Sequence, residues 1–367
     1  MNTSRREWLR QSAFALAAAG IAADVFAGKE KKLLPADNMI LLNSNENAYG
    51  PSPKARKAIL DHYLSSNRYP DDLIPVLKKE IAKHWNIRPE NILFGAGSSE
   101  ILGLVSLHVS FTKGNVITAE PSYRVWNEQA EAFGLNFIRI PLNSERKLDL
   151  EKMKSSINAA TRMVYICNPN NPTGTYIDDA VLRNFVNEVS KSVMVLADEA
   201  YTEFADLPSL ADIAVNNPNV VVAKTFSKIY GLAGARIGYA IAHPDTINKL
   251  GRYQPWTDMG ISTVTANAAL ASVADKAFVD ECREKTKQTR EMCYECFRQL
   301  SLEYVPSHTS FILFNISKLK GDFSGQMRAR NIFVQYREHF GGKWCRVSMG
   351  TTEEMKAFCA ALKSIST

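Results

Sequence analysis

The sequence predicts an α/β fold, with a mostly parallel seven-stranded sheet sandwiched by helices. Seven short apolar runs are strand-like, and amphipathic segments mostly separate the first six of them. Near-continuous apolar strands that alternate with helices are typical of a parallel sheet buried on both faces. The seven runs are residues 91–96, 114–120, 135–142, 162–168, 193–201, 219–227 and 237–242.

The segments between and beyond these runs complete the expected architecture. Helical patterns include "SSEILGLVSLHVS", "PSYRVWNEQAEAFG" and "DDAVLRNFVNEVSK". A tight glycine-rich link joins the last two strand runs, so one strand is expected to be antiparallel. Residues 262–302 are largely helical, and two shorter strand candidates, "SFILFNI" and "WCRVSMG", follow them. We expect an N-terminal arm with part of a smaller α+β domain at 28–70, a large ligand-binding domain at 71–255, and the rest of the smaller domain at 256–367.

The composition excludes some classes of function. The 367 residues are 46% hydrophobic and 22% charged, which is ordinary for a soluble globular protein. The net charge is +6, but the sequence has no lysine/arginine block with interleaved aromatics, so it does not imply nucleic-acid binding. The six cysteines and six histidines have no zinc-like spacing, so no metal site is expected. Disulfides stay possible in an exported protein, although buried thiols are the favoured interpretation.

The N-terminus resembles a targeting segment that is not part of the fold. The charged run "SRREWLR" precedes the apolar run "AFALAAAGIAA" and a small-residue cleavage site after Ala27. The pair Arg5–Arg6 resembles a bacterial twin-arginine signal, which would make the protein periplasmic or secreted. The alternative is an amphipathic N-terminal helix. The apolar run is shorter than the roughly 20 residues that span a bilayer, so no stable membrane insertion is expected.

Polar residues stand where the predicted strands end, which is where ligands bind in such sheets. "FGAGSSE" ends a strand and opens a helix, leaving the backbone N–H groups of Gly97, Ser98 and Ser99 free to bind an anion. "CNPNNPTG" is a rigid polar turn after a strand, and "AEPSYRVW" places an aromatic side chain just past another. Each pattern alone is also compatible with an ordinary turn, cap or half-exposed side chain.

Two strand ends carry charged groups whose burial is unfavourable in free energy. "ADEAY" places Asp198 and Glu199 at the end of an apolar strand, and "KTFSK" places Lys228 after the next one. A lysine there is unfavourable unless it is ion-paired or unless its neutral amine serves as a nucleophile. Together, a phosphate anchor, a buried carboxylate, hydroxyl and amide donors, an aromatic side chain and a strand-end lysine are what pyridoxal 5′-phosphate requires.

These motifs resemble those of one enzyme family. They are "LLNSNENAYGPSP", "NRYPDD", "CNPNNPTG", "DEAY", "TFSKIYGLAGARIGY" and "CRVSMGT", in that order from Leu41 to Thr351. The sequence resembles the fold type I, pyridoxal-phosphate-dependent aminotransferases, and within them the histidinol-phosphate aminotransferase family. The resemblance implies transfer of an amino group between an amino acid or amine and a 2-oxo acid.

The resemblance assigns roles around the cofactor ring. Lys228 would form the internal aldimine with the cofactor aldehyde and later act as general base. Asp198 would pair with the pyridine nitrogen. Tyr201 and Asn171 would hydrogen-bond the phenolic oxygen of the ring, and Tyr123 would stack on its face.

The resemblance also assigns the cofactor phosphate to a set of donors and implies a homodimer. Arginine matches a phosphate bidentately, unlike lysine. Tyr69, from the "NRYP" motif, would reach the phosphate of the neighbouring subunit. The donors within one subunit would be Gly97, Ser98, Ser99, Thr225, Ser227 and Arg236.

Substrate binding is the part in which this sequence departs from the family. Arg346 would bind the substrate α-carboxylate. The family's arginine for the substrate phosphate is replaced here by Gln335, which cannot neutralise a phosphate, and Arg337 lies nearby. The further residues expected to face the substrate are Asn45, Asn47 and Tyr49.

Three hypotheses about function follow. The first is an exported aminotransferase that acts on an amino acid or amine other than histidinol phosphate. The second is a lyase, decarboxylase or cyclase on the same scaffold. The third is a protein that binds the cofactor without catalysis, which is disfavoured because Lys228, Asp198 and Arg346 are all present.

Overall fold

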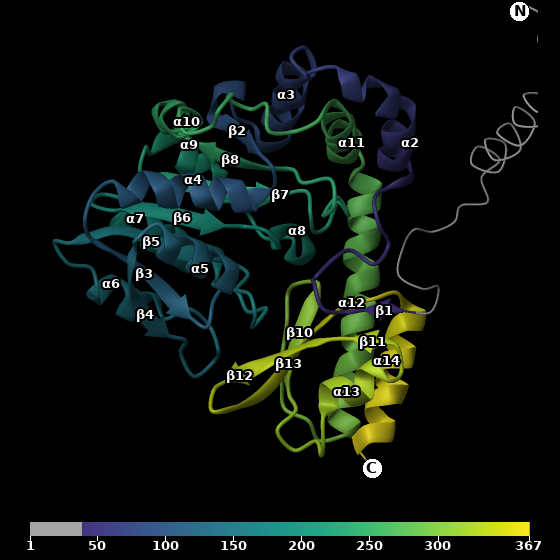
Figure 1. The fold of residues 1–367 in the computed structure, drawn as a ribbon. Coiled ribbons are helices and arrows are strands. Elements are labelled where there is room, and N and C mark those ends of the chain that lie inside the picture. Colours follow the sequence, from purple (N-terminus) through teal and green to yellow (C-terminus); the bar gives the residue numbers. More distant parts are fainter. Residues whose placement is uncertain (1–38, 367) are drawn as a thin grey trace, which may run out of the picture. The chain divides into compact units, whose positions relative to one another are not determined.

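The computed structural model describes residues 39–366, and its largest feature is a seven-stranded sheet (Figure 1). The order of the strands is β2-β8-β7-β6-β5-β3-β4, and only β8 runs antiparallel to its neighbours. Each strand overlaps one predicted run, so the predicted sheet and its antiparallel member are confirmed. The strands are β2 (Ile92–Gly95), β3 (Asn115–Glu120), β4 (Asn136–Pro141), β5 (Thr161–Cys167), β6 (Met194–Asp198), β7 (Val220–Thr225) and β8 (Gly238–Ala242).

Helices cover both faces of this sheet. Side chains along each strand alternate between two apolar clusters, as in β6, where Val195 and Ala197 join one cluster and Leu196 the other. One face packs against α4 (Ser98–Ser110), α5 (Arg124–Ala132) and α10 (Pro244–Gly251). The other packs against α3 (Leu73–Trp85), α6 (Leu150–Ser155), α7 (Asp179–Val189), α8 (Thr202–Ala205), α9 (Ala211–Asn216) and α11 (Thr263–Val273). The two-sided cover explains why the strands are apolar runs without a polar face.

The smaller α+β part combines segments from both ends of the described chain. Its four-stranded antiparallel sheet has the order β12-β13-β10-β9, and β1 pairs in parallel with β11. The strands are β1 (Ile40–Leu41), β9 (Tyr304–Val305), β10 (Phe311–Asn315), β11 (Ile332–Phe333), β12 (Gln335–His339) and β13 (Gly342–Ser348). The helices are α12 (Lys276–Gln299), α13 (Phe323–Arg328) and α14 (Thr352–Ser366). Figure 1 shows α12 running from beside α11 to this smaller sheet.

Short helices and other features complete the described chain. α2 (Pro53–His62) packs against α11, and two 3₁₀ turns lie at Tyr63–Asn67 and Pro89–Asn91.

All six cysteines are buried free thiols. Within residues 39–366, no helix is long and apolar enough to cross a bilayer. The predicted signal segment at 1–27 lies outside the described residues, and the predicted domain boundaries stay predictions.

Candidate active site

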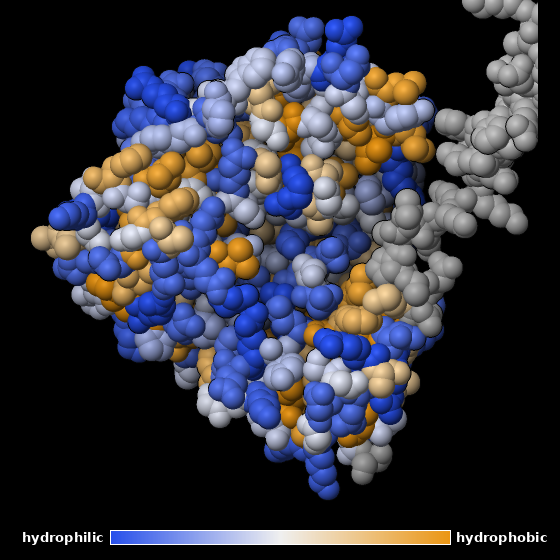
Figure 2. Space-filling view, in the orientation of Figure 1, coloured by the Kyte–Doolittle hydropathy of each residue, from blue (hydrophilic) through white to orange (hydrophobic). Residues whose placement is uncertain are grey.

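The carboxyl ends of the central strands open into two cavities with shared walls. β5, β6 and β7 are neighbours and end at Cys167, Asp198 and Thr225. One cavity has a volume of about 510 Å³ and the other about 310 Å³, and Ser98 and Lys228 line both. Figure 2 shows hydrophilic side chains gathered in the hollow between the two sheets. The ligand site expected at the strand ends therefore coincides with two cavities of the structure.

Most of the predicted site residues line these cavities. The larger cavity contains residues from both sheets, whereas the smaller one contains the predicted anion-binding groups. Those on the larger cavity are Asn45, Ser98, Tyr123, Asn171, Asp198, Tyr201, Lys228, Gln335, Arg337 and Arg346. Those on the smaller cavity are Ser98, Ser99, Tyr123, Thr225, Ser227, Lys228 and Arg236.

The smaller cavity is built to hold an anion. Gly97 precedes α4 with φ of 89°, so the free N–H groups of the helix start beside the cavity. A Cβ atom at Gly97 would lie 2.5 Å from Nη2 of Arg236, so the glycine makes room for the guanidinium. Arg236 donates to the carbonyl oxygens of Ala233 at 2.9 Å and Ala96 at 3.3 Å, and no carboxylate within residues 39–366 forms an ion pair with it. Its charge remains available to a phosphate.

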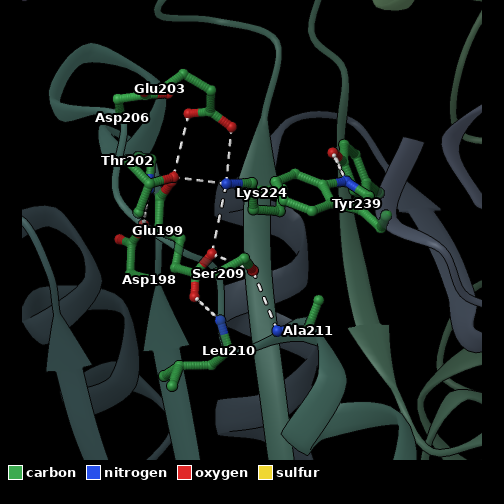
Figure 3. A network of polar contacts seen from close by, with 12 residues as sticks. Asp198, Glu199, Thr202, Glu203, Asp206, Ser209, Leu210, Ala211, Lys224 and Tyr239 are labelled. Carbon is green, nitrogen blue, oxygen red and sulfur yellow. Dashed lines mark hydrogen bonds and ion pairs between the residues drawn. The ribbon is translucent and has the colours of Figure 1, made fainter. Parts of the chain in front are cut away.

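Two lysines follow one another along β7 and its exit, and the structure gives them opposite environments. Lys224 is fully buried, and its Nζ lies 2.7 Å from Glu203 and 3.4 Å from Glu199 (Figure 3). The same Nζ donates to the Thr202 hydroxyl at 2.6 Å. Burial alone lowers the pKa of Lys224, but the two carboxylates outweigh burial and raise it above its ordinary value. Lys224 is therefore a charged, structural lysine.

Lys228 has no carboxylate partner at ion-pair distance among residues 39–366. Its Nζ donates only to the carbonyl oxygen of Ser44, at 3.3 Å, and lies 5.8 Å from the ring centre of Tyr201. Burial, and next the positive charge of Arg346, lower the pKa of Lys228 to about 8. A substantial fraction of this amine is neutral near physiological pH, which is the state that attacks a carbonyl carbon. Of the two lysines, Lys228 is the nucleophile candidate.

Asp198 is buried, and no cationic side chain of the described residues lies at hydrogen-bond distance from it. Its Oδ1 accepts the backbone N–H of Ala200 at 3.2 Å, and its Oδ2 accepts the Tyr165 hydroxyl at 3.0 Å. Burial raises the pKa of Asp198 to about 6, which these hydrogen bonds and Lys228 oppose. Beside it, the Tyr201 hydroxyl accepts the Asn45 side-chain amide at 3.0 Å, and burial raises the pKa of Tyr201. A cationic ligand nitrogen would complete the surroundings of this carboxylate.

Arg346 enters the larger cavity from β13. Its Nη1 donates to Oδ1 of Asn171 at 2.8 Å, and its Nη2 donates to the carbonyl oxygen of Asn43 at 3.0 Å. Its Nε is buried and has no hydrogen-bond partner among residues 39–366. Gln335 lies directly opposite Arg346 in the β12–β13 register, and Arg337 follows on the same strand. No carboxylate of the described chain pairs with Arg346, so it can accept one from a ligand.

Four predicted residues are not among the lining residues of either cavity. Gly97 acts through its backbone shape, as described above. Asn47 donates to the carbonyl oxygen of Ile229 at 2.7 Å, and Tyr49 lies over the Lys285 ammonium. Tyr69 is 71% exposed and packs on Trp256, with ring centres 5.0 Å apart. Substrate contact by Asn47 and Tyr49 therefore stays a prediction without support from this geometry.

Sequence inspection missed two groups next to the site. Lys224 lies inside an apolar run, and the strand run before it ends in Asp198 and Glu199. This pattern could have indicated the ion pairs of Lys224. Tyr165 lies two residues before the strand-end Cys167, so the strand period places both on one face toward Asp198. The bond between Tyr165 and Asp198 depends on how β5 and β6 pair, which the sequence alone did not reveal.

Comparison with known proteins gives a consistent result. Residues 37–362 match the family model "Aminotransferase class I and II". A histidinol-phosphate aminotransferase of Caldicellulosiruptor saccharolyticus is 35% identical over 340 residues, covering 91% of this chain and 94% of that protein. One from Staphylococcus saprophyticus is 38% identical and covers 76% and 78%. The crystal structure of the Sinorhizobium meliloti histidinol-phosphate aminotransferase in complex with pyridoxal 5′-phosphate superposes with a TM-score of 0.81 at 27% identity, covering 89% and 90%.

Proposed function

The chain belongs to the aminotransferase class I and II family and is a pyridoxal 5′-phosphate-dependent aminotransferase, and we propose that its amino donor is an amino acid whose α-carboxylate binds Arg346. The observation behind this proposal is the buried Nε of Arg346, which has no hydrogen-bond partner among the described residues, on a guanidinium that none of their carboxylates pairs with. A planar guanidinium binds a carboxylate through two parallel hydrogen bonds. An amino acid supplies that carboxylate next to the carbon that loses its proton.

The residues of the two cavities fit the cofactor. The smaller cavity offers a helix start and the unpaired Arg236 to a phosphate. The larger one offers Asp198, a buried carboxylate without a cation, to a protonated ring nitrogen. Lys228 lies on both cavities and can reach a group that spans them. When bound, the cofactor supplies an aldehyde for covalent attachment of amines and a ring that withdraws electrons from the substrate Cα.

The protein's own residues would then orient the reactants and move protons. Asp198 would keep the proton on the ring nitrogen, and Tyr201 and Asn171 would donate to the ring oxygen. Tyr123 would cover one face of the ring. Lys228, once free, would take the proton from the substrate Cα at its Nζ, and its lowered pKa lets it act near neutral pH.

We also propose that the substrate side chain lies against β12, where Gln335 and Arg337 face the cavity. The relatives named above are histidinol-phosphate aminotransferases, whose name specifies a phosphate-bearing substrate. The neutral amide of Gln335 would not compensate a phosphate dianion, and Arg337 would supply a single positive charge beside it. We therefore propose an amino acid, rather than histidinol phosphate, as the amino donor.

The experiment adds single amino acids and histidinol phosphate to the holoenzyme without an amino acceptor. A transaminase then releases one equivalent of 2-oxo acid per site and stops. The proposal expects this from at least one amino acid and not from histidinol phosphate. Turnover by histidinol phosphate alone would overturn the substrate proposal. Continuous product formation without an oxo acid would indicate the lyase, decarboxylase or cyclase alternative.

We further propose a homodimer that forms through the region of α2 and the following 3₁₀ turn. Large apolar side chains are exposed there, including Leu60 at 69% and Leu64 at 75%, and the stacked pair Tyr69 and Trp256 is exposed as well. An exposed apolar patch marks an interaction surface. In this dimer, Tyr69 would reach the cofactor phosphate of the partner. This contact would account for the exposure of the Tyr69 side chain in the single subunit.

Mixing two inactive variants tests this shared site. Y69A and K228A subunits, co-refolded or co-expressed, should form heterodimers in which one site carries both changes and the other carries neither. Recovery of activity above that of either variant alone supports the contribution of Tyr69 across the interface. No recovery, with heterodimers demonstrated, would contradict it.

Export is a separate proposal that rests on residues 1–27. The twin-arginine pattern Arg5–Arg6 supports delivery to the periplasm or beyond, after the cofactor is bound in the cytoplasm. Fractionation of cells that express the full chain should show the mature protein outside the cytoplasm. Replacement of both arginines by lysine should retain it inside, and identical fractionation of the two forms would contradict the proposal.

A further inference from the structure

Asp198 is held by a residue outside the predicted site, Tyr165 of β5. The Tyr165 side chain is fully buried, and its hydroxyl lies 3.0 Å from Oδ2 of Asp198 on the neighbouring strand. Burial raises the pKa of Tyr165 well above its ordinary value, so the phenol keeps its proton and donates it. The other carboxylate oxygen accepts the N–H of Ala200. These two donors fix the plane of the carboxylate.

The hydroxyl of Tyr165 is selective for the charged form of its neighbour. A phenol donates more strongly to a carboxylate than to a protonated acid, so this bond opposes the effect of burial on Asp198. The residues beside Tyr165 in the strand are Val164 and Ile166, whose apolar side chains pack into the opposite cluster. Packing alone would be served by phenylalanine at position 165, and the hydroxyl adds the bond to Asp198 and a weaker contact with the Cys167 thiol.

A stack of aromatic rings holds Tyr165 in this orientation. The ring of Trp126 lies parallel to it, with centres 3.7 Å apart and planes inclined by 21°. Trp126 is fixed in turn, because its Nε1 donates to the Ser106 hydroxyl of α4 at 2.9 Å. Trp126 belongs to α5, the helix preceded by Tyr123, which lines both cavities. Tyr123 would cover the cofactor ring, and Asp198 would bind the ring nitrogen. Both are connected to Trp126, Tyr123 through α5 and Asp198 through Tyr165.

We propose that Tyr165 is a positioning residue, which holds the Asp198 carboxylate as an anion in line with the nitrogen of the cofactor ring. The proposal rests on the role given above to Asp198. Tyr165 itself does not line either cavity, so it acts through Asp198 and not by touching the cofactor.

The test compares two cofactors in the apoprotein: pyridoxal 5′-phosphate and its 1-deaza analogue, which has carbon in place of the ring nitrogen. Y165F removes one hydroxyl and keeps the ring stack. It should weaken the binding of pyridoxal 5′-phosphate roughly 10- to 100-fold, the range for a hydrogen bond to a charged group. Binding of the deaza analogue should change less than about twofold, because that ring has no nitrogen for Asp198 to bind. In a D198N background, Y165F should have no further effect.

Y239F is the matched control. Tyr239 is also a buried tyrosine of the sheet, and its hydroxyl accepts a hydrogen bond from Trp85 outside the two cavities. Y239F should leave the affinities for both cofactors unchanged, and thermal melting should show that both variants fold. If Y165F lacked a folded state, 3-fluorotyrosine at position 165, a stronger donor of similar shape, should tighten the binding of pyridoxal 5′-phosphate; weaker binding would overturn the proposal.

The outcomes separate the proposal from the function on which it rests. Equal weakening of both cofactors by Y165F, or no weakening of either, would overturn the role of Tyr165 and leave that of Asp198 standing. If wild-type protein bound both cofactors equally and D198N changed neither affinity, the role of Asp198 would fail, and with it that of Tyr165.

Discussion

Replacement of Asp198 by asparagine should stabilise the apoprotein while it impairs the enzyme. Without its cofactor, the protein holds a buried carboxylate that has no cation at hydrogen-bond distance among the described residues. Asparagine has almost the same shape: its Oδ1 can accept the N–H of Ala200 and its Nδ2 can donate to the Tyr165 hydroxyl, but it has no charge to bury. The function of this site therefore opposes the stability of the empty protein.

The size of the effect follows from the shift in the pKa of Asp198. The pKa rises from 3.8 to about 6 on folding, which is about two units, and each unit corresponds to about 1.4 kcal/mol. Because the native pKa is raised, the contribution of this carboxyl to stability is complete below about pH 4 and is lost as the pH rises through about 6. D198N should therefore gain up to ~3 kcal/mol over the wild type at pH 7. For a chain of this length, that gain corresponds to a melting temperature higher by about 4 °C.

Calorimetry of the two apoproteins between about pH 3.5 and 8 measures this effect. The difference in melting temperature should be small at the acid end, should grow between about pH 4 and 6, and should then level off. A difference independent of pH would refute the reasoning, since it would come from packing and not from the charge. A less stable D198N at pH 8 would refute it as well. Addition of pyridoxal 5′-phosphate should reverse the order, because only the wild type gains the bond to the ring nitrogen.

Three further changes have expected outcomes. R346Q should raise the KM for amino acids roughly 10- to 100-fold. R346K should be intermediate, because lysine keeps the charge and loses the bidentate geometry. An unchanged KM in steady-state assays would exclude Arg346 as the carboxylate site. K224A should destabilise the protein by about 3–5 kcal/mol in thermal melting, because it leaves two carboxylates buried and unpaired, whereas K228A should not. G97A should weaken the affinity for pyridoxal 5′-phosphate about tenfold or more in fluorescence titrations, because its Cβ displaces Arg236 and its φ is unfavourable; unchanged affinity would show that the cradle does not need this close approach.

The large sheet was predictable because both of its faces are covered. Strands buried on two sides must be apolar throughout. Each of them is therefore recognisable in the sequence as an apolar run, followed by the polar residues that begin the next helix. The antiparallel β8 was also expected, since a glycine-rich link without a helical pattern joins it to β7. The helical run 262–302 was less informative: it divides at Asp275 into α11 and α12, and Asp275 pairs with the distant Lys54 at 2.7 Å.

The candidate site was predictable to the extent that its residues belong to local motifs. The strand ends brought Asp198 and Lys228 to one edge, and the resemblance to a family supplied Arg346 from the other sheet. The hydrogen bond from Tyr165 and the pairing of Lys224 depend on which strands are neighbours and in what register, which local patterns do not encode. The same reason explains why Asn47, adjacent to well-placed residues in the chain, bonds elsewhere.

Lys228, and not the buried Lys224 four residues before it, is the lysine expected to carry the cofactor. The most direct measurement reduces the holoenzyme with borohydride, which makes the bond between lysine and cofactor permanent, and then maps the modified peptide by mass spectrometry. We expect the cofactor on Lys228, and loss of the visible absorbance band of the holoenzyme in K228A. Attachment to Lys224, or an unchanged band in K228A, would contradict it.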